Sequence, residues 1–134
     1  MTLDGLVTIL SAFGPKETMD RLEMDVKAKG LTVFARVDHA AGADAIGLKL
    51  RPTELLIFGN AKGGTPLMEA DQRIGIDLPL KALVYQDEAG KVRLSYTDPS
   101  WLARRYGLGA AVSANVEALS KVLAGVAAGA TKSP

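Results

Sequence analysis

The segment of residues 52–85 constrains the fold more than any other part of this 134-residue chain. It contains an uninterrupted apolar run from Leu55 to Phe58, then a glycine-containing turn, then a second apolar run over residues 80–86. A short continuous apolar run between turn signals is typical of a strand that is buried on both faces of a sheet. We therefore expect a central strand over residues 54–59 and a returning strand over the second run.

Two longer segments show the spacing of amphipathic helices. In the first, Gly14-Pro15 provides a start, because proline suits the first helical position, and Gly30 suits the position after the last turn. Apolar residues recur at helical spacing in both segments. They are Met19, Leu22 and Val26 in the first, and Val116, Leu119, Val122, Leu123 and Val126 in the second. We expect both helices to cover the sheet, with Ser113 as the cap of the second.

Residues 32–38 alternate in the manner of a strand. The alternation predicts two faces, with Val33, Ala35 and Val37 on one and Phe34 and Arg36 on the other. We expect the face of Phe34 and Arg36 to be the exposed one. An exposed sheet face must either carry polar residues or be covered by a partner, and a second copy of the chain could be that partner.

The order of strands and helices lacks the regular alternation of a parallel α/β fold. It predicts an α+β fold: a single domain with a mostly antiparallel sheet of about five strands and helices packed mainly on one face. The domain is expected to span residues 1–134, with a core over about residues 6–127. Residues 128–134 are small or polar and are expected to be disordered.

The charge balance and the residue types missing from the sequence narrow the function classes. A net charge of +1 provides no field that would attract nucleic acid or an anionic membrane. The chain has no cysteine and one histidine, which excludes disulfides and thiolate sites and argues against a zinc site. The apolar run near the N-terminus is too short for a membrane span. We expect a cytoplasmic protein without metal, nucleic-acid or membrane binding, and the sequence names no cofactor.

Four stretches in order carry a resemblance to a known family. They are residues 30–40 (GLTVFARVDHA), 50–60 (LRPTELLIFGN), 64–68 (GTPLM) and 77–80 (DLPL). Together they resemble the bacterial family called domain of unknown function 302, over roughly residues 7–126. The resemblance implies an α+β domain and a small homodimer, and it brings no established activity.

The same resemblance marks a set of residues as the family's pattern without assigning them roles. They are Asp38, His39, Arg51, Pro52, Asn60, Thr65, Pro66 and Asp77.

The turn after the central strand is the best candidate for a ligand site. Thr65-Pro66 predicts a helix start, with Thr65 as the N-cap, and the free N–H groups of a helix N-terminus attract anions. The alternative is a tight turn in which Gly63 or Gly64 adopts a positive φ and no ligand binds. The candidate ligand-binding residues are Asn60, Lys62, Gly63, Gly64, Thr65 and Arg51.

Asp38 and His39 form the second candidate, this time for catalysis. His39 next to a carboxylate can act as a general acid/base. The alternative is that Asp38 caps a short helix and His39 serves the turn.

Two functions follow from these candidates. The favoured one is a non-enzymatic ligand-binding or accessory domain that acts as a homodimer and takes a small anionic ligand. The alternative is an enzyme that uses His39 on a small anionic substrate held by Lys62 and Arg51. The first is favoured because the chain offers one acid/base residue and no complete catalytic set.

Overall fold

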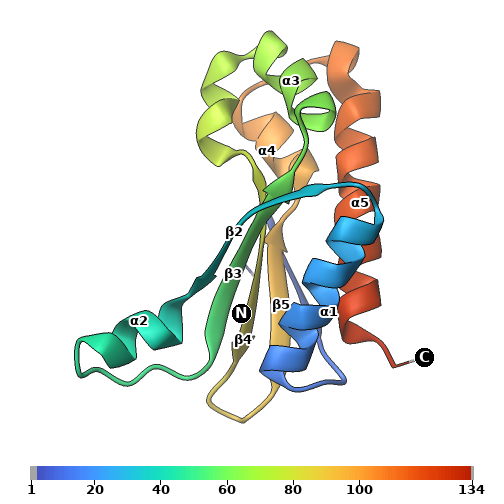
Figure 1. The fold of residues 1–134 in the computed structure, drawn as a ribbon. Helices are drawn as coiled ribbons and strands as arrows, with labels where there is room; N and C mark the ends of the chain where they lie inside the picture. The colour runs from blue at the N-terminus through green and yellow to red at the C-terminus, as the bar shows by residue number, and fades with distance from the viewer. Residues whose placement is uncertain (1–2, 134) are drawn as a thin grey trace.

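Five antiparallel strands form one sheet in the order β1-β5-β4-β3-β2 (Figure 1). The computed structural model describes residues 3–133. The strands are β1 Leu6–Leu10, β2 Thr32–Asp38, β3 Thr53–Gly59, β4 Leu80–Gln86 and β5 Val92–Thr97. This arrangement confirms the predicted α+β fold and the number of strands.

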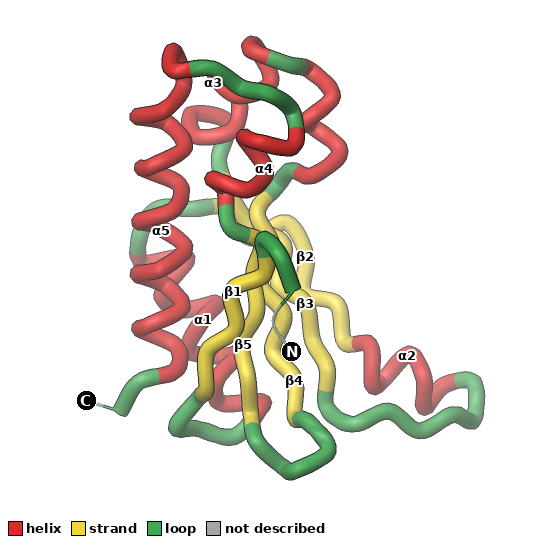
Figure 2. Tube along the Cα trace, turned by 180° about the vertical axis from the view of Figure 1, so that it is seen from behind, coloured by secondary structure: helices red, strands yellow, loops and turns green. Residues whose placement is uncertain are grey.

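Five helices and two 3-10 turns accompany the sheet. They are α1 Pro15–Ala28, α2 His39–Ala45, α3 Ala61–Ala70, α4 Pro99–Arg105 and α5 Ser113–Thr131, with η1 Gln72–Asp77 and η2 Ala110–Val112. Helices α1 and α5 lie side by side on one face of the sheet, whereas α3 and α4 gather beyond one end of it (Figure 1). Figure 2 shows the other face of the sheet, with no helix lying over it. Helix α2 projects away from the body.

The protein has two hydrophobic cores, one under the helix pair and one at the end of the sheet. The main core joins the sheet to α1 and α5; its largest members are Phe58, Met19, Leu22, Leu56, Leu94 and Leu123. The second core lies among α3, η1, α4 and α5 and contains Leu67, Ile74, Leu102, Val112 and Val116. Burial of these apolar side chains is the main favourable term that holds the elements together.

The apolar run of β3 is buried on one face only. Leu56 and Phe58 face the helices and are fully buried, whereas Leu55 and Ile57 are half-buried on the opposite face. The prediction of burial on both faces is therefore wrong. An antiparallel sheet can keep one face free of helices, because hairpins do not need helical crossovers.

A bulge in β2 reverses the predicted facing of Arg36. The register skips Phe34 between Val33 and Ala35, and such an extra residue interrupts the alternation of side chains. Beyond the bulge, Arg36 pairs with the core residue Leu56 and faces α1. Phe34 is exposed as predicted (56%), but the prediction that Arg36 shares its face is wrong.

Arg36 is the centre of an ion-pair network between the sheet and α1. Its guanidinium donates two hydrogen bonds to Glu54 of β3, at 2.9 and 3.1 Å. It also donates to Asp20 at 2.8 Å and to Glu23 at 3.1 Å, both on α1. The hydrogen bond from Arg36 lowers the pKa of the Asp20 carboxyl, and hydrogen bonds from Lys27 and Arg36 lower that of Glu23.

The C-terminal helix extends further than the sequence predicts. Residues 128–131 continue α5, and Ala130 and Thr131 are buried. The N–H group of Ala12 donates to the carbonyl of Thr131 at 2.8 Å, which fixes this end against the loop after β1. Ser113 is the first residue of α5 rather than its cap; its hydroxyl donates to the carbonyl of Ala110 in η2.

We expect Arg36→Ala to lower the free energy of unfolding by about 2 kcal/mol at pH 7, between the values for exposed and buried pairs, because it leaves three carboxylates without their shared cation. Urea unfolding measures this, with Lys16→Ala as a control, since Lys16 pairs with Asp20 at an exposed site.

The effect of Arg36→Ala should also depend on pH. A carboxylate whose pKa is lowered by folding stabilises the fold above its unfolded value and loses that contribution as the pH falls through its folded value. For Asp20 and Glu23 the ordinary values are 3.8 and 4.5, so wild type and variant should converge in stability below about pH 4. A difference that stays constant down to pH 2.5 would assign the loss to packing instead.

Candidate functional site

Helix α3 begins five residues earlier than the sequence predicts. Its N-cap is Asn60, whose side-chain oxygen accepts a hydrogen bond from the N–H group of Gly63 at 2.7 Å. Thr65 and Pro66 lie inside the helix, so the prediction of Thr65 as N-cap is wrong. Asn60 is as good a capping residue as threonine. Pro66 is the sixth residue of the helix, where its missing N–H group removes one intrahelical bond, to the carbonyl of Lys62.

Gly63 and Gly64 have helical conformations rather than the positive φ of a tight turn. A Cβ atom at Gly63 would lie 3.0 Å from the Asn60 side-chain oxygen and 3.1 Å from a methyl group of Leu119 on α5. Glycine therefore lets the first turn of α3 approach both its cap and α5. The close approach is a packing reason for the glycine at this position.

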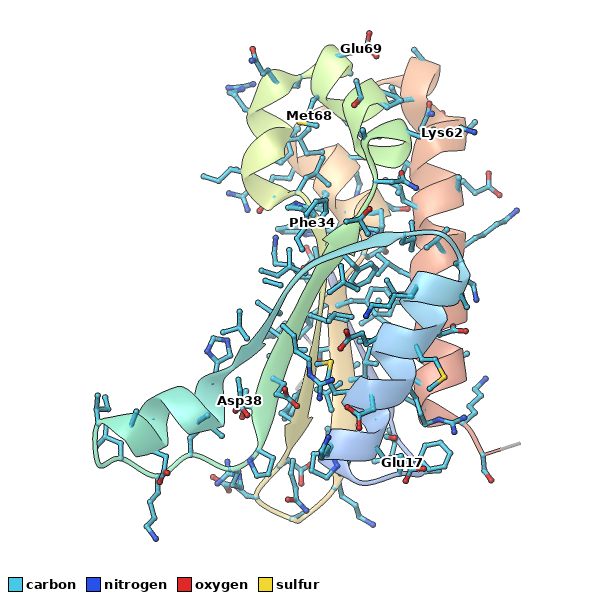
Figure 3. The ribbon with its side chains drawn as sticks, in the orientation of Figure 1. Glu17, Phe34, Asp38, Lys62, Met68 and Glu69 are labelled. Atoms are coloured by element: carbon cyan, nitrogen blue, oxygen red, sulfur yellow. The ribbon has the colours of Figure 1, made fainter. Side chains whose placement is uncertain are left out.

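A pocket of about 520 Å³ lies beside this first turn, between α3, α5 and the ends of β2 and β4. Its lining is mostly apolar and includes Leu31, Phe34, Met68, Leu78, Leu119 and Val122. Figure 3 labels Phe34 on β2, with Lys62 and Met68 on α3. Among the described residues that line the pocket, Lys62 carries the only charge, and Asn60 and Asn115 carry amide groups.

Four of the six predicted ligand-binding residues line this pocket: Asn60, Lys62, Gly63 and Gly64. Thr65 is exposed on α3 and is not part of the lining. Arg51 lies at the other end of β3, where its guanidinium donates to the carbonyl of Gln86 at 3.2 Å. Within residues 3–133, Lys62 has no ion-pair partner.

The catalytic candidates Asp38 and His39 lie far from this pocket. Strands β2 and β3 are neighbours but run antiparallel, so Thr32 pairs with Gly59 and Asp38 pairs with Glu54. Thr32 and Asp38 are six positions apart along the strand, so the two ends are separated by about 20 Å. The structure therefore does not bring His39 together with Lys62.

Asp38 acts as the cap of α2, as the alternative interpretation predicts. Its carboxylate accepts a hydrogen bond from the N–H group of Ala41 at 2.9 Å. His39 is exposed at the first position of α2. A second cleft, lined by Arg36, Asp38, Asp44 and Glu54 among others, lies at this end of the sheet. Its charged groups belong largely to the Arg36 network and the α2 cap.

Asp77 from the family's pattern has a structural role that the sequence alone does not show. Its carboxylate accepts a hydrogen bond from the Tyr106 hydroxyl and lies 3.8 Å from the Arg105 guanidinium. The hydrogen bond to Asp77 raises the pKa of Tyr106. These contacts tie η1 to the end of α4 beside the second core.

Sequence analysis missed most of the pocket's apolar wall. Leu119 and Val122 were expected to face the sheet, because they follow the helical spacing of the buried positions on α5. In the structure both are half-buried and line the pocket, and Leu119 also packs against the main core beside the sheet, as expected. The sequence signal for this wall is the width of the apolar stripe on α5, which is wider than the surface that the sheet can cover.

Two further properties of the described residues concern metals and membranes. No group of three or more His, Cys, Asp or Glu residues within the described part of the chain could hold a metal ion. The segment Ala110–Thr131 is long and apolar enough to cross a membrane by length and composition alone. Its residues Leu123, Val126, Ala127 and Ala130 are buried in the main core, as expected for a core helix.

We expect Asn60→Ala to lower the free energy of unfolding by about 1 kcal/mol, because the first turn of α3 loses its cap. Thr65→Ala is the matched control: it lies inside the helix, where alanine is the better helix former, and should leave stability unchanged or slightly higher. Urea denaturation of the two variants measures the difference. A loss at Thr65 equal to that at Asn60 would contradict the assigned start of α3.

The sequence is similar to part of several named bacterial proteins. Over 115 residues, or 86% of this chain, the sequence is 48% identical to proteins named fluoride-specific ion channel FluC 1 from Brucella suis biovar 1 (strain 1330) and FluC 2 from Brucella melitensis biotype 1. The matched region is 45% of the length of the first protein and 43% of the second. The chain thus spans less than half of these relatives.

The fold has a counterpart among solved structures. The crystal structure of an uncharacterized conserved DUF302 protein from Bacillus stearothermophilus matches with a TM-score of 0.83, covering 96% of this chain and 99% of that one. At 22% sequence identity the likeness shows the shared fold alone. The sequence profile of Domain of unknown function DUF302 matches residues 7–126, nearly the whole chain. The chain therefore belongs to the DUF302 family.

Proposed function

We propose that this chain is a non-enzymatic accessory domain that acts as a homodimer in the cytoplasm and binds a small anionic ligand at the pocket beside α3. The observation that carries the proposal is the position of Lys62. It is the one charged group among the described lining residues, it has no ion-pair partner among them, and it stands in the first turn of a helix. A helix N-terminus and an adjacent lysine both favour a negative charge.

The geometry supports binding more than catalysis. A general acid/base must lie within hydrogen-bond reach of the group on which it acts. The antiparallel register holds His39 at the far end of the sheet from Lys62, and the Asp38 carboxylate is engaged as a helix cap. None of the described residues that line the pocket is histidine, aspartate or glutamate. Lys62 is thus the one titratable side chain among the described lining residues, and the pocket offers recognition groups without a paired acid/base set.

The fluoride-channel relatives support the accessory role. Their shared segment accounts for less than half of their length. Structures that cross a lipid bilayer must satisfy every backbone polar group internally. A five-stranded open sheet with edges at β1 and β2 does not meet this requirement. In this proposal the shared segment is therefore the accessory part of those relatives, and the rest of their length conducts the ion.

The helix-free face of the sheet supports the homodimer. On this face, Arg93, Ser95 and Thr97 of β5 separate Leu6 and Leu10 from the other apolar residues. Across β2, β3 and β4 the face carries a patch of exposed or half-buried apolar and aromatic residues: Val37, Leu55, Ile57, Leu83 and Tyr85. Contiguous apolar surface of this kind is rare on monomers and marks interaction sites. A second copy can cover it through a self-complementary, two-fold interface, the commonest symmetry of small oligomers.

Titration with inorganic phosphate, followed by amide NMR, tests the ligand-binding part. We expect the amides of residues 60–67 to shift at millimolar to tens-of-millimolar phosphate, with weaker binding at high salt. Lys62→Ala should reduce the shifts, whereas Lys91→Ala, at the exposed β4–β5 turn, should leave them unchanged. If no amide in this segment moves, the pocket does not bind inorganic phosphate.

Light scattering at micromolar concentration tests the dimer. The wild type should scatter with twice the 14.1 kDa mass of the chain. Leu83→Lys should give the monomer, because it places a charge at the centre of the apolar face. Met24→Lys is the matched control, since Met24 is 70% exposed on the outer side of α1. A wild type of about 14 kDa would contradict the proposal.

A further inference from the structure

The pocket beside α3 is larger and more apolar than an inorganic anion needs. Its inner wall is formed by Leu31, Leu78, Leu80 and Leu119, and Met68 of α3 lies against it. Its volume of about 520 Å³ falls in the range of sites for small organic molecules. A phosphate or fluoride ion placed against such a wall would lose hydration without gaining hydrogen bonds.

The polar side chains of the pocket come from two segments of the chain. Asn60 and Lys62 belong to the start of α3, and Asn115 belongs to the nearby turn of α5. The N–H group of Gly63 is taken by the Asn60 side chain, but those of Ala61 and Lys62 belong to the first turn, which has no intrahelical acceptors. The pocket thus combines one cationic segment that carries N–H donors with an otherwise mostly apolar lining.

Resting on the ligand-binding function proposed above, we propose that the ligand is an amphipathic monocarboxylate. Its carboxylate lies at Lys62 and the first turn of α3, and its apolar body lies between α3 and α5 against Leu119 and Val122. Lys62 is complementary to a negative charge, and the apolar wall is complementary to a hydrocarbon body. These two features favour an amphipathic monocarboxylate over an inorganic anion, which would use only Lys62. The same two features favour it over a neutral lipid, which would use only the apolar wall.

Small residues and the β2 bulge give the pocket its shape. A Cβ atom at Gly64 would meet Leu78 and Met68 at 3.6 and 3.7 Å, which is ordinary van der Waals contact, so a methyl group would fit there and would take up part of the pocket. The bulge turns Phe34 out of the alternation and sets its ring at the rim of the pocket. An apolar tail leaving the pocket would meet an aromatic surface there.

Decanoate, acetate and decanol separate the two halves of the ligand. In amide NMR titrations of the full chain, we expect decanoate to bind at least ten-fold more tightly than acetate, because only decanoate fills the apolar part. Lys62→Ala should weaken decanoate binding about five-fold, as for an exposed ion pair, and leave decanol unchanged. Lys91→Ala is the charge control.

A steric variant tests the location. Ala118 is exposed on α5 and lines the pocket, whereas Ala124 is exposed on α5 outside it. Ala118→Trp should weaken decanoate binding at least ten-fold, and Ala124→Trp should not. If Ala118→Trp does not fold, nuclear Overhauser effects between decanoate methylenes and the methyl groups of Leu119 and Val122 in the wild type give the same information.

The outcomes distinguish this inference from the proposed function. If phosphate and acetate shift residues 60–67 as strongly as decanoate at equal concentration, anion binding stands and the amphipathic ligand is overturned. If no anion shifts these amides, both fall. Decanoate shifts that map to the helix-free face of the sheet, around Leu55 and Leu83, also overturn the inference.

Discussion

The contact of α5 with both hydrophobic cores is the constraint on which the rest of the structure depends. The helix has 19 residues, which span about 28 Å. Near its start Val116 packs in the second core, and further along Leu123 and Val126 pack in the main core. One rigid element therefore fixes the position of α3 and α4 relative to the sheet. The pocket lies where α5 passes from one core to the other, and its walls come from both sides of that junction.

Much of this architecture could be predicted from the sequence because it follows from periodicity. The apolar spacing of α1 and α5, the proline at the start of α1 and the glycine after its end all identify the helices that cover the sheet. Strand β2 was predicted with its observed bounds. The facing of Arg36 could not be predicted, because a bulge inserts one residue without changing the amino-acid pattern. Which residue is skipped depends on pairing with β3, a contact distant in the sequence.

The prediction of where α3 starts failed for a different reason. Thr65-Pro66 and Asn60 are both acceptable starts, and the two glycines between them disfavour a helix by about 1 kcal/mol each. Local propensity therefore points to Thr65. Tertiary contact reverses the choice: Gly63 sits against Leu119, and Leu67 is buried in the second core, so the extra turn is held from outside. Of the candidate residues, those at the start of α3 lie together at the pocket, whereas Arg51 and His39 lie at the other end of β2 and β3. Strands β2 and β3 run antiparallel, and the local sequence pattern does not specify that direction.

Helix α2 contributes no buried residue, and Ile46, just after it, is 73% exposed. Its only fixed points are the Asp38 cap and the two strands that flank it. The free energy needed to open a segment depends on the apolar contacts that opening breaks. Local opening of α2 should therefore need little free energy, whereas opening of the sheet under α5 should need the most. Its amides should exchange with solvent through fraying that leaves the rest of the molecule folded. Packing therefore places little constraint on this arm beyond its first residues, where the Asp38 side chain caps the helix.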